Sequence, residues 1–314
     1  MRFYRFSRSA MGTEFQVILC GEDPDYLRDA AEQALDEIER VEAQLSHYRP
    51  DSDITDLNLR AAYGPVRLEP LLFGLLERAR GLAELSGGAF DPTCGALIRC
   101  WGFYRGQGAP ANETAVAAAL HRTGFQQLEL EPAGCTVHFR VEGLEVHLGA
   151  LGKGYALDRA AAELRTAGVE AALLHGGTSS VYAVGAPPAA PGWEVGLCDP
   201  DDRARRIGTL LLRDQALSTS GDYEQFFEIA GERYSHILDP RTGLPARGTR
   251  SATVVAPSAA DTDALSTAAF VLGVEGTRRL REQVPGFAAL LMPEEAGGKK
   301  LQPVLLGDIP VELS

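Results

Sequence analysis

The chain has 314 residues, of which 45% are hydrophobic and 23% charged, a composition typical of a globular protein with a large core. At about 100–200 residues per domain, this length corresponds to one large domain or two closely joined ones. The net charge of −13 argues against general nucleic-acid binding, which requires clustered lysine and arginine side chains to neutralise phosphates.

The cysteines and the amino-terminal residues indicate a reducing compartment. Five scattered cysteines suggest neither a disulfide framework nor a paired-cysteine metal site. No run approaches the ~18 apolar residues of a membrane-spanning helix. Glu14 and Gln16 interrupt the apolar stretch that a signal peptide needs, and Leu19 is too large for a lipoprotein processing site at Cys20. We therefore expect a cytoplasmic protein, or an exported one if a leader has been removed.

Hydrophobic periodicity predicts alternating strands and helices along the chain. In chain order we expect a strand at 14–19, a helix at 26–45, a turn at 50–52, a helix at 71–85, a hairpin at 128–139, a strand at 143–150, a helix at 155–167, strands at 171–177, 180–186 and 193–199, a hairpin at 226–238, a strand at 251–256 and a helix from 261. Gly108–Ala119 is the most linker-like stretch, but it is short and its alanines give it helical character. Several hairpins among mixed elements indicate an α+β or mixed α/β fold.

The segment DTDALSTAAFVLG, residues 261–273, begins a predicted helix with many side-chain oxygens. Capping of the first turn by Asp261 or Thr262 accounts for one or two of them. Asp263 and Thr267 are four residues apart and therefore share a helix face. A carboxylate and a hydroxyl stacked in this way can hold a hard cation, so capping and metal binding both stay open.

The segment GALGKGY, residues 149–155, lies between a predicted strand and a predicted helix. Glycines there let the backbone approach a phosphate, and a helix N-terminus favours an anion. The segment is not a Walker A loop, because Gly154 stands where a serine or threonine would follow the lysine. The alternatives are a phosphate-binding loop that uses Lys153 and a tight turn with a solvated lysine.

Two further segments carry candidate residues. In SHILDPRTG, residues 235–243, His236 precedes a rigid turn, where it is either a general base or an ordinary surface or core histidine. In SGGAFDPTCGALIRCWGF, residues 86–103, the aromatic residues Phe90, Trp101 and Phe103 either line a pocket for a flat ring or belong to the core. No G-x-S-x-G nucleophile motif occurs, so covalent hydrolase chemistry has no support.

Seven segments, in this order, resemble the ApbE-type FAD:protein FMN transferases. They are MGTEF (11–15), LSHYRPDSDITDLN (45–58), GGAFDPTCGAL with WGF (87–103), LGALGKGYALD (148–158), HGGTSSVYAVG (175–185), TSGDYEQFFEIAGERYSHILDPRTG (219–243) and ADTDALSTAAFVLG (260–273). The resemblance runs from about residue 4 to 295 and implies the family's T-fold-like architecture of mixed sheets flanked by helices. It implies one flavin-transferase domain over residues 1–314, in two closely joined halves with FAD in the cleft.

The resemblance also implies a reaction and its residues. Enzymes of this family cleave the pyrophosphate of FAD, attach FMN to a Ser or Thr hydroxyl of a target flavoprotein and release AMP, and they need Mg²⁺. By position, His236 looks like the base for the incoming hydroxyl. The implied metal ligands are the carboxylate of Asp263, the hydroxyl of Thr267 and the backbone carbonyl of Ala150. The implied FAD contacts are Met11, Tyr48, Ala89, Phe90, Asp91, His147, Lys153 and Ile237.

Two positions depart from the family pattern. His147 stands where an acidic FAD contact is usual, and His175 replaces the more usual asparagine ahead of the Gly-Gly pair. A histidine can donate a hydrogen bond or stack on a ring but cannot act as an anion, so we expect a different FAD affinity or pH dependence. The alternative functions are an FAD pyrophosphatase that yields FMN and AMP, and a flavin-binding or trafficking protein with little turnover.

Overall fold

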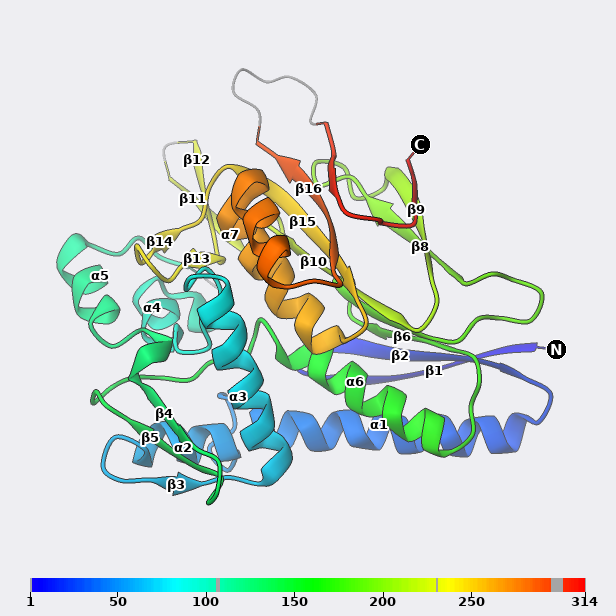
Figure 1. Cartoon of the computed structure of the whole chain (residues 1–314), viewed down its shortest axis with the longest axis horizontal. Coiled ribbons are helices and arrows are strands. Elements are labelled where there is room, and N and C mark those ends of the chain that lie inside the picture. The colour runs from blue at the N-terminus through cyan, green and yellow to red at the C-terminus, as the bar shows by residue number, and fades with distance from the viewer. Residues whose placement is uncertain (1, 106–107, 230, 295–301, 314) are drawn as a thin grey trace.

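The computed structural model describes residues 2–105, 108–229, 231–294 and 302–313. Its centre is an eight-stranded sheet in the order β1-β2-β6-β7-β10-β15-β16-β17, in which neighbouring strands run antiparallel (Figure 1). The strands are β1 (Arg2–Ala10), β2 (Thr13–Gly21), β6 (Ala172–Gly176), β7 (Ser180–Val184), β10 (Gln215–Gly221), β15 (Thr249–Ala256), β16 (Ala288–Pro293) and β17 (Val304–Leu306).

Each face of the large sheet is covered by a different layer. Phe15 and Val17 of β2 point to a core shared with the helices α1 (Pro24–Leu45), α6 (Gly152–Thr166) and α7 (Ala259–Gln283). Ile18 points to the opposite face, as the two-residue period of a strand requires. There the sheet packs against a three-stranded sheet of β8 (Trp193–Cys198), β9 (Arg206–Leu212) and β18 (Val311–Leu313).

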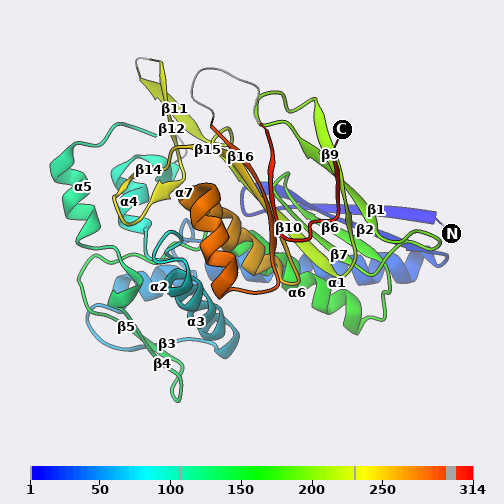
Figure 2. The ribbon, with the colours of Figure 1, turned by 45° about the horizontal axis from the view of Figure 1, so that its top comes forward.

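A lobe of smaller elements lies beside the sheet, next to α7 (Figures 1 and 2). It contains α2 (Asp53–Arg60), α3 (Pro70–Leu85), α4 (Gly95–Cys100), α5 (Glu113–Leu120), the 3₁₀ turns η1 (Phe103–Arg105) and η2 (Phe125–Gln127), and a sheet of β3 (Val66–Arg67), β5 (Thr136–Phe139) and β4 (Leu128–Glu131). Two short ribbons lie near this lobe: β11 (Phe226–Ile229) with β12 (Glu232–Ser235), and β13 (Leu238–Asp239) with β14 (Leu244–Pro245).

Most of the predicted elements are confirmed, and the fold is mixed α and β as expected. The predicted strand at 143–150 is wrong. Of that segment only Glu145 forms a bridge, to Cys94, while the side-chain amide of Asn58 binds both the backbone N–H and the carbonyl of Val146. A side chain thus satisfies the backbone groups that a neighbouring strand would otherwise pair. The hairpin at 226–238 has its strands at 226–229 and 232–235, and Ala230 at its tip lies outside the described residues.

The predicted capping of α7 by Asp261 or Thr262 is also wrong. The N-cap is Ser258, and the carboxylate of Asp158 on α6 accepts hydrogen bonds from its hydroxyl and from the backbone N–H groups of Ala259 and Ala260, at 2.8–2.9 Å. Asp261 instead forms an ion pair with Arg78 on α3. A half-buried carboxylate on α6 thus accepts from the first backbone N–H groups of α7 and links its start to α6.

Gly154 allows α6 and α7 to meet. A Cβ at this position would lie 1.9 Å from the carbonyl oxygen of Ala259, so no larger residue fits without moving one of the two helices. We expect Gly154→Ala to lower the free energy of unfolding by about 3 kcal/mol, and the melting temperature by about 5 °C. The matched control is Gly81→Ala in α3, where the added methyl meets open space and a helix-interior alanine should be neutral or stabilising. Thermal unfolding of both variants checks this, and equal melting temperatures would contradict it.

Candidate active site

Asp263, on the second turn of α7, has a buried carboxylate with two protein donors. One oxygen, Oδ1, accepts a hydrogen bond from the hydroxyl of Ser180 at 2.7 Å, and Oδ2 accepts one from the backbone N–H of Gly154 at 2.6 Å. The hydroxyl of Thr267 lies one turn later and donates to the Asp263 carbonyl at 3.2 Å. The structure therefore brings the 149–155 loop and the start of α7 together, as the metal hypothesis requires.

The donors at this junction fit a hard cation such as Mg²⁺. Asp263 is 6% exposed, and it has no ion pair within 4.0 Å among the described Lys, Arg and His residues, so its buried charge lacks a cationic partner. Each carboxylate oxygen has used one lone pair and keeps another. No cluster of three His, Cys, Asp or Glu side chains occurs in the described part of the chain, so a site here must use hydroxyl or backbone oxygens as well. Thr267 and Ala150, which lies in the turn before α6, offer such oxygens.

His236 follows β12 and has a defined tautomer. Its Nδ1 lies 3.0 Å from the carbonyl oxygen of Gln225, which also accepts the backbone N–H of His236 at 3.0 Å. Because a carbonyl oxygen only accepts, Nδ1 carries the proton and Nε2 keeps a free lone pair. Burial lowers the pKa of His236 and outweighs the Gln225 carbonyl and the charge of Glu224, which raise it, while Lys153 lowers it slightly. A neutral imidazole with an unprotonated Nε2 is the form that a general base needs near neutral pH.

His147 belongs to a cluster of aromatic rings that the sequence did not predict, made of His47, Tyr48, Tyr104 and His147. The Nε2 atoms of His47 and His147 are 3.1 Å apart, and the backbone N–H of Gly149 donates to Nδ1 of His147 at 3.3 Å. This assigns the proton of His147 to Nε2, which donates to His47. The ring centroid of Tyr48 lies 3.9 Å from that of His47, and Tyr48 is 62% exposed.

Arg99 anchors the other side of the cluster. Its guanidinium carbon lies 3.6 Å from the centroid of Tyr104, whose hydroxyl donates to the carbonyl of His47 at 2.6 Å. Glu145 holds Arg99 with two hydrogen bonds of 2.6 and 2.7 Å. The exposed Tyr48 ring is thus backed by ordered rings, as a surface for a flat ligand would be. That Tyr48 and His147 contact FAD stays a prediction.

The two cluster histidines make stability depend on pH. Burial lowers the pKa of His47 to about 4 and that of His147 to about 3, with the nearby Arg99 contributing to both shifts. Below their ordinary value of about 6.5 the unfolded chain binds protons that the folded chain does not. We therefore expect the free energy of unfolding to fall as the pH is lowered from about 6.5 to about 4. Urea unfolding across this window should show a smaller fall for His147→Asn, and equal slopes in the two proteins would contradict the assignment.

The remaining predicted FAD contacts lie in two settings. Met11 and Gly12 form the turn of the β1–β2 hairpin with φ of 51° and 71°, and the N–H of Met11 donates to Glu42 at 2.6 Å. Ala89, Phe90, Asp91 and Ile237 are 0–7% exposed. The Asp91 carboxylate accepts from Thr93 and from the backbone N–H of Phe125, so it orders its own loop. Their contact with FAD stays a prediction.

Trp101 and Phe103 belong to the core rather than to an open pocket. Both are 5% exposed, and the Trp101 indole N–H donates to the carbonyl of Gly243 at 2.7 Å. His175 lies partly buried on β6, where burial lowers its pKa. All five cysteines are free and half-buried.

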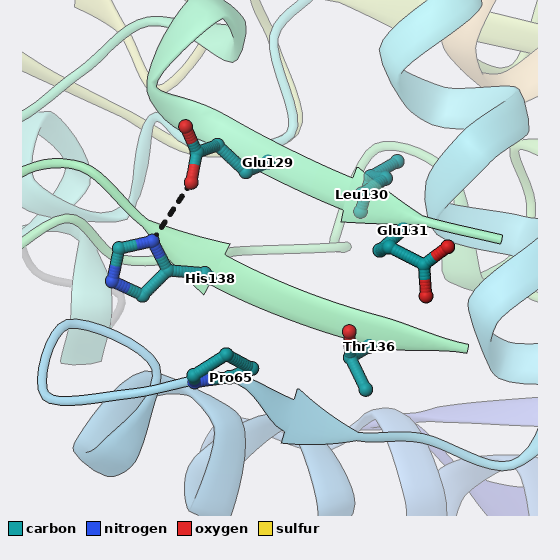
Figure 3. A pocket seen from close by; sticks show the side chains of 6 residues that line it. All are labelled: Pro65, Glu129, Leu130, Glu131, Thr136 and His138. Atoms are coloured by element: carbon teal, nitrogen blue, oxygen red, sulfur yellow. Dashed lines mark hydrogen bonds and ion pairs between the residues drawn. The ribbon is translucent and has the colours of Figure 1, made fainter. Parts of the chain in front are cut away.

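Two surface hollows lie away from these residues. One, of about 400 Å³, is lined by Pro65, Glu129, Leu130, Glu131, Thr136 and His138 on the β3-β5-β4 sheet (Figure 3). The other adjoins it along β4 and η2. In the first, Glu129 pairs with His138 and Arg140, which lower its pKa. These contacts are ordinary surface ion pairs, and neither hollow contains a predicted site residue.

Comparison with known proteins identifies the family. The ApbE family model matches residues 11–291. The FAD:protein FMN transferase of Treponema pallidum is 34% identical over 308 residues, which cover 93% of this chain and 85% of that protein. One from Klebsiella pneumoniae is 34% identical over 287 residues, covering 90% and 87%.

Solved structures agree with the sequence comparison. The ApbE protein of Thermotoga maritima superposes with a TM-score of 0.86 at 31% identity and 96% coverage of both chains. The apo flavinyl transferase ApbE of Pseudomonas stutzeri gives 0.83 at 30% identity, covering 98% of this chain and 95% of that one. The fold is thus that of the flavin transferases. The chain belongs to the ApbE family. In the described part of the chain, every helix is too short or too polar to span a lipid bilayer.

Proposed function

We propose that this enzyme transfers the FMN part of FAD to a Ser or Thr hydroxyl of a target flavoprotein and releases AMP, in a reaction that depends on Mg²⁺. The observation that carries the proposal is the buried Asp263, which has no basic partner among the described residues and is held against the backbone beside Lys153. The positive charge of Mg²⁺ would offset the negative charge of Asp263. The negative pyrophosphate of FAD would lie near the positive charge of Lys153. The curated relatives named above are FAD:protein FMN transferases.

The reaction requires one bond to form and one to break. The acceptor hydroxyl oxygen bonds to the phosphorus of the FMN half, and the bond from that phosphorus to the bridging oxygen breaks, so that AMP leaves with that oxygen. The hydroxyl proton passes to Nε2 of His236, whose Nδ1–H stays bound to the carbonyl of Gln225. Lys153 provides positive charge for the pyrophosphate. Bound Mg²⁺ neutralises negative charge on the phosphates, and Asp263, Thr267 and Ala150 would hold it.

A water molecule in place of the acceptor hydroxyl would make the same site an FAD pyrophosphatase. The test is AMP release from FAD and Mg²⁺ in the presence of acceptor peptides that contain threonine, compared with the same peptides carrying valine. We expect AMP release to depend on the hydroxyl. Equal AMP release with both sets, accompanied by free FMN, would favour hydrolysis, and FAD binding with no AMP release at all would favour a flavin-binding protein.

A further inference from the structure

The start of α7 is fixed to the large sheet through buried serine hydroxyls. Ser180 on β7 donates to the carboxylate of Asp263 at 2.7 Å, and Ser218 on β10 lies 2.9 Å from the hydroxyl of Thr262. The two serines are 0% and 1% exposed. Thr262 and Asp263, which are consecutive on α7, are thus each bound by a serine from one of two neighbouring strands. Only Ser180 contacts a carboxylate.

Ser180 and Gly154 together fix the orientation of the Asp263 carboxylate. The two donors come from β7 and from the start of α6, and each binds a different oxygen. A carboxylate held at both oxygens cannot rotate about its last side-chain bond without losing one of these hydrogen bonds. The remaining lone pairs therefore point in set directions, which is how residues behind a metal ligand raise its affinity.

We propose that Ser180 is a positioning residue that orients the Asp263 carboxylate for the cation. This inference rests on the proposed function, because it takes Asp263 as a ligand. Ser180 is the one described side chain that donates a hydrogen bond to this carboxylate. Without its hydroxyl, Oδ1 has no protein donor and only Oδ2 stays fixed by the backbone N–H of Gly154. The carboxylate then samples orientations that do not present both lone pairs to the site.

The test compares Ser180→Ala with Ser218→Ala. Each variant removes one buried hydroxyl that binds α7, so both are expected to lose similar thermal stability, but only Ser180 touches the carboxylate. Mn²⁺, which also prefers oxygen ligands, serves as the probe, and its binding in the absence of FAD is measured by electron paramagnetic resonance. We expect Ser180→Ala to weaken Mn²⁺ binding by about 10–100-fold, and Ser218→Ala to change it by less than about twofold.

Asp263→Ala distinguishes an error in the role of Ser180 from an error in the proposed metal site itself. If Asp263→Ala loses the Mn²⁺ site while Ser180→Ala and Ser218→Ala both bind as the parent does, the positioning role is overturned and the metal site stands. If Asp263→Ala binds Mn²⁺ as tightly as the parent, the proposed metal site is itself wrong. If Ser180→Ala does not fold, Ser180→Cys keeps the side-chain size but donates only weakly, and parent-like Mn²⁺ affinity in that variant would overturn the role.

Discussion

Asp263→Ala is expected to reduce Mg²⁺-dependent AMP release from FAD by on the order of 10³ or more. The variant removes the only carboxylate of the proposed ligand set, and the oxygens of Thr267 and Ala150 alone are too weak to hold the cation. Excess Mg²⁺ should not restore the rate. The measurement is AMP production at saturating FAD over a range of Mg²⁺ concentrations.

Asp261→Ala is the matched control for this variant. Asp261 lies two residues earlier on α7 and forms an ion pair with Arg78 on α3. Its loss removes one carboxylate from the same helix start and should leave the Mg²⁺ dependence unchanged. Comparable loss of activity in the two variants would show that activity depends on the negative charge at the start of α7 and not on Asp263 as a ligand of Mg²⁺.

His236→Ala is expected to slow FMN transfer by about 10²–10⁴ and to leave FAD binding intact. The substitution removes the unprotonated Nε2 that would accept the proton of the acceptor hydroxyl, while Nδ1–H is held by the Gln225 carbonyl. Single-turnover transfer and FAD titration, measured separately, distinguish the two effects. His138→Ala, which removes a histidine paired with Glu129 on the β3-β5-β4 sheet, is the control and should transfer FMN normally. Transfer at the parent rate in His236→Ala would exclude it as the base.

Periodicity predicted the long elements of the fold well. α1 and α3 carry apolar residues at intervals of three and four along one buried face, so their bounds agree with prediction to within two residues. The sequence did not predict β1, an edge strand in which all residues but Ala10 are exposed or half-buried and few are apolar. The segment 143–150 has the alternation of a strand but no strand partner among the described residues: the backbone of Val146 bonds to the side chain of Asn58, and the N–H of His147 donates to the carbonyl of Pro92.

The candidate site was predictable where its residues are close in sequence. Asp263 and Thr267 share a helix face, and that spacing alone raised the metal hypothesis. Ser180 lies 83 residues from Asp263, and His47 lies 100 residues from His147, so only the folded chain shows that these pairs meet. The exact role of Gly154 was also hidden, because the closeness of α6 to Ala259 is a property of packing.

The intact mass of an acceptor peptide shows whether FMN becomes bonded to a hydroxyl of the acceptor. A threonine-containing peptide that serves as acceptor is incubated with the enzyme, FAD and Mg²⁺, and AMP is quantified in the same sample. We expect a mass increase equal to FMN less one water, one AMP for each adduct, and neither product with Asp263→Ala. AMP and free FMN in equal amounts, with the peptide mass unchanged, would contradict it.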